Sequence, residues 1–490
     1  MRQVELSTLL NKPLHFSWHL TGLAAGILAG TALIPVLTDY TFTDSRWLLV
    51  VIALLLPLLL GRQRWLVIGA FISGLILGLY SGSVADSRLA KYEPYFGQMV
   101  HLSGHIADDT TYSSRGELQL RLNHITIDGR RLPGEVWTST MTQIELKRGD
   151  HIQLKGQLEP GFGSMSATLF RATLIEAIRP SPGDIARRVR DRFTDYVRLA
   201  IPEPQSLLGV SYLTGQRGLL PGDISQQLRL LGLAHIVVAS GFHLTIVTRY
   251  FHKLLRPISK YLTTFFSLTV IASFLLLTGF STSMVRASLV ASLSLLAWYY
   301  GRQIHPIVLL LSVAATTVLI DPAVIWGDIG WFLSFTAFTG VIILAPLLHD
   351  FFWGSDKEPG AVRHIAVGTI AAQITTFPVV ALVFGQYSPL ALLANLLLLP
   401  FIPITMGLTL LSGLGAAFLP SLASIFGAPA YALLLGMTTV TDWLALSPYA
   451  TSELNFSVTA VAISYVLITL LMVYLWRVTK HNFRRYNPIV

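Results

Sequence analysis

Residues 19–37 read HLTGLAAGILAGTALIPVL, an apolar run without a single Asp, Glu, Lys or Arg. A helix of this length crosses the roughly 30 Å hydrocarbon core of a bilayer. The run is too long for the core of a typical signal peptide, and Thr31–Pro35 does not provide the small-residue cleavage site that such a peptide needs. We therefore predict a retained transmembrane helix.

The composition of the 490-residue chain is that of a membrane protein throughout. Hydrophobic residues make up 53% and charged residues 12%, about half the usual charged share of a soluble domain. The mean hydropathy is +0.60. These values exclude a soluble globular protein. The chain contains no Cys, which excludes a disulfide framework, a catalytic thiolate and a Cys-ligated metal site.

Apolar runs like the first recur on both sides of a polar middle segment. Three precede it, near 19–37, 47–60 and 65–80. Nine follow it, near 233–250, 261–280, 284–300, 304–320, 329–348, 362–384, 389–418, 425–446 and 457–476. The run at 389–418 contains Pro400 and Pro403, so it is either one kinked span or two half-length segments. The predicted fold class is a polytopic α-helical membrane protein of about twelve spans with an inserted all-β domain.

The inserted segment has the periodicity of β-strands. Leu118, Leu120 and Leu122 alternate with polar residues, which is the pattern of a half-buried strand. Similar short runs occur near 98–107, 133–140, 150–158 and 168–178, separated by Gly, Asp and Pro. Five short strands in this length fit a small extracytoplasmic barrel of the OB type.

The chain therefore divides into five regions. We assign 1–85 to about three N-terminal spans, 86–182 to the OB-like domain, 183–232 to amphipathic helices, 233–478 to about nine spans and 479–490 to a basic tail. The third region begins with a helix in which Ile185, Val189, Phe193 and Val197 recur every four residues. This pattern predicts a helix whose Ile185–Val197 face lies on the membrane surface or against the bundle.

Basic residues collect at alternate ends of the predicted spans. With a cytoplasmic N-terminus, the short outward loops hold only Arg46, with Arg286 just inside the adjoining span. The inward ends carry Arg2, Lys12, Arg62, Arg64, Arg249, Lys253, Arg256, Lys260, Arg302, Lys357, Arg363, Arg477, Lys480, Arg484 and Arg485. This skew follows the positive-inside rule. It predicts an inner-membrane protein with both termini cytoplasmic, a periplasmic or extracellular β-domain, and a single crossing at 389–418.

The net charge of +9 belongs to those inward ends and does not by itself indicate nucleic-acid binding. Between residues 86 and 179 there are 11 Lys and Arg against 11 Asp and Glu. A basic groove in this domain would have to be assembled by folding. The candidates for DNA contact are Arg121, Arg130, Arg131, Lys147, Arg148 and Lys155; the alternative is an ordinary solvated surface.

The densest polar cluster in the membrane region is 233–246, LAHIVVASGFHLTI. His235 and His243 are eight residues apart, about 80° around a helix, so both would address one interior. Ser240 and Gly241 between them would permit a helix break or a close helix approach. Three interpretations of the two imidazoles remain open. They are packed in the protein interior with their hydrogen bonds satisfied, they line an aqueous path, or they form a metal-binding or catalytic pair. Because no acidic residue lies at ligand spacing, we predict no metal site and no cofactor.

Further polar groups occur in neighbouring spans. Arg286 would either snorkel to the headgroups or contact an anionic substrate. Gln373, followed by two Thr and Pro378, and Asn395 each interrupt an apolar helix. Intramembrane polar groups are costly and usually face a cavity or a partner. Together they predict a polar interior.

These segments, taken in order, resemble the ComEC family of competence proteins. LLGLAHIVVASGFHLTIV at 230–247 is similar to the family's paired Gly-Leu-x-His and Ser-Gly-x-His signature, and MVRA at 284–287 to its Val-Arg-Ala. Asp321-Pro322, GWFLSF at 330–335 with Ser334, and the segments around Gln373 and Asn395 match later elements. The resemblance covers about 205–405.

The resemblance implies an inner-membrane channel that takes single-stranded transforming DNA into the cytoplasm during natural competence. The implied path candidates are His235, Ser240, Gly241, His243, Arg286, Ser334, Gln373 and Asn395. The implied partners are single-stranded DNA, the bilayer, a DNA receptor and cytoplasmic translocation proteins, and an oligomer is left open.

The sequence departs from the family in two ways. Trp331 stands where Phe is usual, and the His-x-His-x-Asp-His motif of the metallo-β-lactamase-like domain carried by many members does not occur. A P-loop is also missing from the sequence. We therefore expect no nuclease, ATPase or other enzymatic activity.

Two other classes of function remain. An envelope polymer-handling enzyme or transporter would need a catalytic group at an outward cavity, for which Arg286 with Asp328 is the only candidate pair. A non-conducting scaffold of the uptake machine would carry no current.

Overall fold

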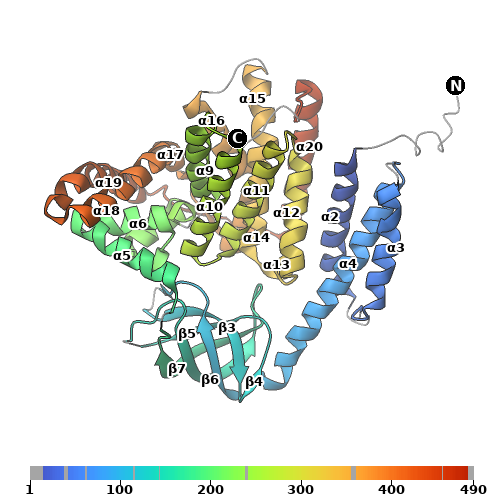
Figure 1. Cartoon of the computed structure of the whole chain (residues 1–490), viewed down its shortest axis with the longest axis horizontal. Coiled ribbons are helices and arrows are strands. Elements are labelled where there is room, and N and C mark those ends of the chain that lie inside the picture. Colours follow the sequence, from blue (N-terminus) through green and yellow to red (C-terminus); the bar gives the residue numbers. More distant parts are fainter. Residues whose placement is uncertain are drawn as a thin grey trace. The chain divides into compact units, whose positions relative to one another are not determined.

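The computed structural model describes residues 15–37, 42–60, 63–113, 116–142, 144–181, 183–237, 241–354, 360–454 and 456–483. The chain forms two compact units (Figure 1). Unit 1 comprises 1–107, 116–180 and 300–332, and unit 2 comprises 108–115, 181–299 and 333–490. Packing therefore groups residues 300–332 with the N-terminal helices, although they lie far along the sequence.

The helices of unit 1 pack through glycines. They are α2 (Phe16–Leu33), η1 (Ile34–Val36), α3 (Arg46–Leu60), α4 (Leu66–Leu89), η2 (Ala90–Tyr95), α12 (Pro306–Ile320) and α13 (Val324–Gly327). A Cβ on Gly26 of α2 would lie 2.1 Å from the Phe71 carbonyl oxygen of α4, and one on Gly74 would lie 2.1 Å from that of Leu23. The two backbones are in direct contact, as in the close crossings of membrane helices. Helix α12 also packs on α2.

The predicted β-domain is a closed five-stranded barrel in unit 1 (Figure 1). Its strands are β1 (Met99–Ile106), β3 (Leu118–Ile127), β5 (Val136–Thr140), β6 (His151–Pro160) and β7 (Ala167–Ile178), and β4 (Arg130–Arg131) extends β3. The order β1-β3-β5-β7-β6 returns to β1, and only the β5–β7 pair in this circuit is parallel. This connectivity is that of an OB-type barrel.

The barrel interior is filled by the inward residues of the alternating pattern. Leu118, Leu120 and Leu122 are all buried, which confirms the predicted strand and the face that it buries. Tyr92 of η2 is fully buried in the same core, and its hydroxyl donates to the Pro133 carbonyl oxygen. The end of the third helical span is thus built into the barrel.

Unit 2 contains three groups of helices. The first comprises α5 (Ile185–Ala200), α6 (Gln205–Thr214), η3 (Arg217–Leu219), α7 (Gly222–Leu230), α8 (Ala234–Val237), α17 (Ala391–Leu398), η5 (Leu399–Phe401), α18 (Ile402–Phe418), η6 (Pro420–Leu422) and α19 (Ala423–Ala445). The second comprises α9 (Gly241–Leu255), α10 (Lys260–Thr278) and α11 (Thr282–Tyr299).

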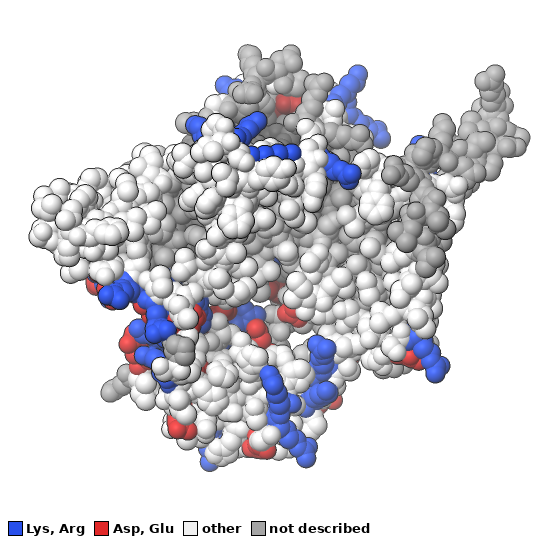
Figure 2. All heavy atoms as spheres, in the orientation of Figure 1, with Lys and Arg blue, Asp and Glu red and all other residues white. Residues whose placement is uncertain are grey.

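The third group comprises the π-helical segment η4 (Gly340–Leu344), α15 (Ala345–Trp353), α16 (Ala361–Phe384) and α20 (Val458–Thr479). Helix α14 (Ile329–Thr339) leads into η4 and begins in unit 1. Unit 2 also holds the short strand β2 (Thr111–Tyr112). In Figure 2, Lys and Arg gather where α9 and α15 end, while the flank formed by α18 and α19 shows almost no charge.

The described residues contain eight helices that are long and apolar enough to cross a membrane. They are Phe16–Val36, Leu66–Tyr95, Lys260–Thr278, Ile329–Trp353, Arg363–Phe384, Ala391–Phe418, Pro420–Ala445 and Val458–Thr479. Arg46–Leu55 and Pro306–Ile320 are shorter apolar helices. The protein is therefore a multi-pass membrane protein with a small barrel, but the count of twelve spans is not confirmed.

The segment at 389–418 belongs to a longer stretch that starts and ends at one place in unit 2. Strand β8 (Gln386–Tyr387) precedes it and pairs antiparallel with β9 (Ser452–Glu453), which follows α19. Between two paired strands the chain crosses a bilayer an even number of times. One crossing by Ala391–Phe418 and one by Pro420–Ala445 meets this condition, whereas two crossings by the first would not.

The two sides of the amphipathic helix α5 have different surroundings. Ile185 and Val189 are about 60% exposed, while Arg187 and Arg190, on the opposite side of α5, are buried. In the second half of the helix Val197 packs against Gly413 of α18, and a position of the exposed apolar residues on the membrane surface stays a prediction. Arg190 is buried because it makes a long-range ion pair, which periodicity does not register.

Candidate functional site

The segment predicted as a span at 233–250 is helical on both sides of residues 238–240. Helix α8 covers Ala234–Val237 and α9 covers Gly241–Leu255, while residues 238–240, which include Ser240, lie outside the described residues. The choice between a continuous helix and a helix break at Ser240 and Gly241 therefore stays a prediction.

Gly241 brings the start of α9 against two other helices. A Cβ on this residue would lie 3.3 Å from the Ala287 Cβ of α11 and 3.6 Å from the Phe338 Cζ of α14. His243, two positions further into α9, is fully buried. The first described turn of α9 therefore packs against α11 and α14 inside unit 2.

Arg286 belongs to the same region of unit 2. It is 2% exposed and precedes Ala287, which packs with Met284 and the α9 residue Leu244 in one buried cluster. Since the side chain is enclosed by protein, the structure does not support snorkelling to a headgroup surface. A buried guanidinium in a membrane helix is costly, which makes Arg286 a candidate functional group.

His235 has a different environment from His243. It is exposed on α8, and its Nδ1 lies 2.9 Å from the Gly232 carbonyl oxygen. The two imidazoles are near enough to interact electrostatically, but they do not share one buried face. Residues 238–240 between them lie outside the described residues, so the predicted 80° relation stays a prediction.

A strip of polar side chains joins α14, α16 and α20. The Tyr465 hydroxyl of α20 donates to the Thr375 carbonyl oxygen of α16 over 3.1 Å and also hydrogen-bonds the Thr336 side chain of α14. Ser334 and Gln373 lie on the same two helices, α14 and α16, and both are half-buried. The predicted polar segments are thus on helices that interact with one another.

Two features next to this strip have the character of a functional site. Gly340 begins the π-helical segment, and a Cβ there would lie 2.5 Å from both the Ala371 carbonyl oxygen and the Thr375 hydroxyl. π-Helical turns are rare and occur frequently at functional sites. Asn395 of α17 is 3% exposed, and its Oδ1 has no hydrogen-bond partner among the described residues. A buried amide in this state is costly unless water or a ligand reaches it.

Asp328 and Trp331, both in unit 1, have structural roles. The Asp328 carboxylate accepts from the Trp331 backbone amide at the start of α14, over 3.0 Å. The Trp331 indole N–H donates to the Thr317 hydroxyl, also over 3.0 Å. The indole thus makes a hydrogen bond that the usual Phe would lack, which explains this departure from the family pattern.

The six basic candidates of the barrel do not have one common environment. Arg121 pairs with Glu135, Lys147 lies 3.2 Å from Glu145, and Arg148 is buried. Arg130, Arg131 and Lys155 are exposed. Arg131 Nη2 lies 2.9 Å from His124 Nδ1. Three of the six are therefore presented to solvent without a carboxylate partner in the described barrel.

Sequence reasoning missed two buried arginines of α5. Arg190 is 2% exposed and binds both carboxylate oxygens of Asp109, at 2.6 and 2.7 Å. Arg187 is 4% exposed, and its Nε and Nη1 have no hydrogen-bond partner within the described ranges. A buried guanidinium without a counter-charge is unfavourable, so Arg187 is an additional candidate for contact with an anion. Sequence reasoning missed Arg187 because it lies on the polar side of an amphipathic helix.

Fold and site together define a multi-pass helical membrane protein with a small OB-type barrel and buried polar groups among its helices. Residues 212–478, more than half of the chain, match the family described as Competence protein. The chain belongs to this family, and its role is in DNA uptake during competence. No curated protein and no solved structure matches it.

Proposed function

We propose that the protein is a twelve-span channel of the inner membrane that conducts single-stranded DNA into the cytoplasm. The observation that carries this proposal is the burial of two ionisable groups in the membrane region of unit 2, His243 of α9 and Arg286 of α11. Ionisable groups inside membrane spans are costly and mark the paths of ions and substrates. A phosphodiester backbone is the anionic group that competence presents.

The pattern of polar groups fits conduction better than tight binding. His243, Asn395 and the Tyr465–Thr375 strip provide hydrogen-bonding groups, and Arg286 supplies full charge. A strand must enter a site and also leave it, so strong binding at any one point would block passage. Scattered hydrogen-bonding groups with few cations among them meet both requirements.

The basic end of unit 2 supports the proposed orientation. Arg249, Lys253, Arg256 and Lys260 lie where α9 ends and α10 begins, and Arg363 lies at the start of α16. Under the positive-inside rule this end is cytoplasmic, which would place both termini in the cytoplasm and the barrel outside. The barrel would receive the strand, with Arg130, Arg131 and Lys155 as its exposed cations. A DNA receptor, cytoplasmic translocation proteins and an oligomeric state belong to the same proposal.

The test is a transformation assay with labelled donor DNA in a deletion strain. Complementation with His243→Ala or Arg286→Gln is expected to lower transformation at least tenfold while DNA still reaches the outer face of the inner membrane. Thr269→Ala, an exposed polar position on α10, is the matched control and should transform like wild type. Normal transformation in the deletion strain would refute the proposal.

Ionic current separates the channel from a scaffold. The purified protein in a planar bilayer should conduct, and single-stranded DNA should block the current transiently. A correctly folded protein that carries no current would favour the non-conducting scaffold. In the polymer-enzyme alternative Asp328 would be the catalytic carboxylate, and one of its oxygens accepts from the Trp331 amide at the start of α14.

A further inference from the structure

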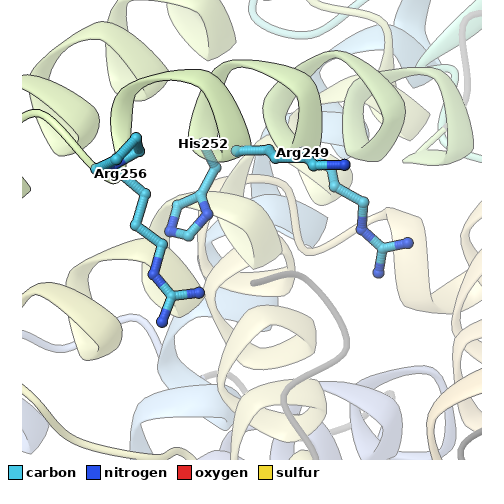
Figure 3. A pocket seen from close by; sticks show the side chains of 5 residues that line it. Arg249, His252 and Arg256 are labelled. Atoms are coloured by element: carbon cyan, nitrogen blue, oxygen red, sulfur yellow. The ribbon is translucent and has the colours of Figure 1, made fainter.

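A basic cavity of about 420 Å³ lies at the C-terminal end of α9. It is lined by Arg249, His252, Lys253, Arg256 and Pro257 (Figure 3). Arg249 and Lys253 are four residues apart and Arg256 follows after three, so all three cations lie on one side of the helix. None of the lining residues is acidic, and this end of α9 therefore has an excess of positive charge around a hollow.

Part of this charge has an ordinary explanation. Cations at a helix C-terminus interact favourably with the helix dipole, and basic residues at span ends set topology. Neither effect requires a cavity. Lys253 and Arg256 form no ion pair with another described residue, and like charges at this spacing repel each other.

His252 provides an independent indication of a ligand. Its side chain points to the same side of α9 as the Arg249 and Arg256 guanidinium groups (Figure 3). It is 7% exposed, and its Nε2 has no hydrogen-bond partner in the part of the chain that the structure describes. The ring is held edge-on against Trp298, with centroids 4.6 Å apart. A buried polar atom that is fixed in place and unsatisfied is unfavourable unless a bound group reaches it.

The surface next to the cavity is apolar rather than polar. Leu254, Ile258, Tyr261 and Phe265 are all more than 60% exposed at the end of α9 and the start of α10. Lys260 lies over the Trp298 and Tyr299 rings, 5.8 and 5.4 Å from their centroids. Aromatic and basic residues mark the headgroup level of a membrane helix, and the apolar side chains beside them would contact acyl chains. The expected ligand is therefore an amphiphile with an anionic head.

We propose that this cavity binds the headgroup phosphate of an anionic phospholipid. Arg249, Lys253 and Arg256 supply the positive charge, and His252 supplies a hydrogen bond to a phosphate oxygen. The acyl chains lie along the exposed apolar surface of α9 and α10. Basic pockets between membrane helices bind anionic lipids in this way. The proposal does not depend on the conduction of DNA.

The test measures lipid binding by native mass spectrometry of the full chain purified in detergent. Phosphatidylglycerol is expected to bind and phosphatidylcholine, which has the same phosphate but no net charge, is not. In K253Q/R256Q the dissociation constant for phosphatidylglycerol should rise about 30-fold. R130Q/R131Q removes the same charge from the exposed strand β4 of the barrel and should bind the lipid like wild type.

A third variant tests the geometry apart from charge. His252→Phe keeps the aromatic contact with Trp298 but removes the hydrogen bond, and it should weaken phosphatidylglycerol binding several-fold. Equal binding of both lipids, or equal losses in the two double variants, would overturn the proposal. A competition experiment separates the lipid from nucleic acid. The proposal would also be overturned if a short single-stranded oligonucleotide, but not inorganic phosphate, displaced the lipid from the wild-type protein and failed to do so in K253Q/R256Q. The cavity would then be a nucleic-acid site.

Discussion

The ion pair between Arg190 and Asp109 should determine whether residues 108–113 stay attached to α5. The Arg190 side chain is 2% exposed, while the Asp109 carboxylate is 28% exposed. Removing one partner of a buried pair costs about 3–5 kcal/mol. Because Asp109 is partly solvated and Arg190 also donates to the Leu277 carbonyl oxygen over 3.2 Å, we expect about 2–3 kcal/mol for Asp109→Asn.

Hydrogen exchange of the detergent-solubilised full chain measures this effect locally. A loss of 2–3 kcal/mol should accelerate exchange of the amides in 108–113 about 30- to 150-fold. Gly218 limits any compensating shift, since a Cβ there would lie 2.2 Å from the Thr110 carbonyl oxygen. The segment is held tightly on both sides, so it cannot relax into a new contact.

The matched control is an ion pair exposed on the same helix. Arg198 Nε lies 3.3 Å from Glu203 Oε1, and both side chains are more than 40% exposed. Glu203→Gln should cost less than about 1 kcal/mol because exposed pairs contribute little. If Asp109→Asn changes the exchange rate no more than Glu203→Gln does, the ion pair does not hold the segment and the reasoning is wrong.

Three further predictions concern other parts of the chain. Gly340→Ala should lower the melting temperature and transformation together, because its Cβ would meet the Ala371 carbonyl oxygen at 2.5 Å; Gly368→Ala, with nothing within 4 Å, should change neither. Trp331→Phe should cost about 1 kcal/mol by removing the hydrogen bond to Thr317, and a thermal shift equal to that of wild type would contradict this. Burial, then the neighbouring His151 and His124, lower the pKa of His105 from 6.5. The unfolded chain therefore takes up the proton first as the pH falls. Protection of the β1 and β6 amides should be full above about pH 6.5 and decrease below it, and His105→Gln should flatten this dependence; an unchanged pH profile in the variant would refute it.

Periodicity alone predicted the elements that depend on local burial. The five strands of the barrel were predicted from alternation, and Leu118, Leu120 and Leu122 face its core as expected. Most apolar runs likewise became helices of the predicted extent. These predictions hold because each residue's preference for lipid, core or water repeats along its own segment.

The sequence also contained the site candidates, but not their environments. His243 and Arg286 were predicted as polar groups of the membrane region, and both are buried in unit 2. His235 of α8, in contrast, is exposed although the sequence places it in the same polar cluster. Burial of a polar group is decided by neighbours that lie far away in the chain, and these are not encoded in its local pattern.

What the sequence by itself determined is the class of protein: many apolar spans, one small barrel and the ordered motifs of a competence protein. Only the tertiary structure decided that Arg187 and Arg190, rather than Ile185 and Val189, form the buried face of α5, and that α12 packs with the N-terminal helices. The physical reason is that hydrophobic periodicity is a property of one segment. An ion pair such as Arg190–Asp109, or a glycine contact such as that of Gly241 with α11, exists only once segments distant in sequence have come together.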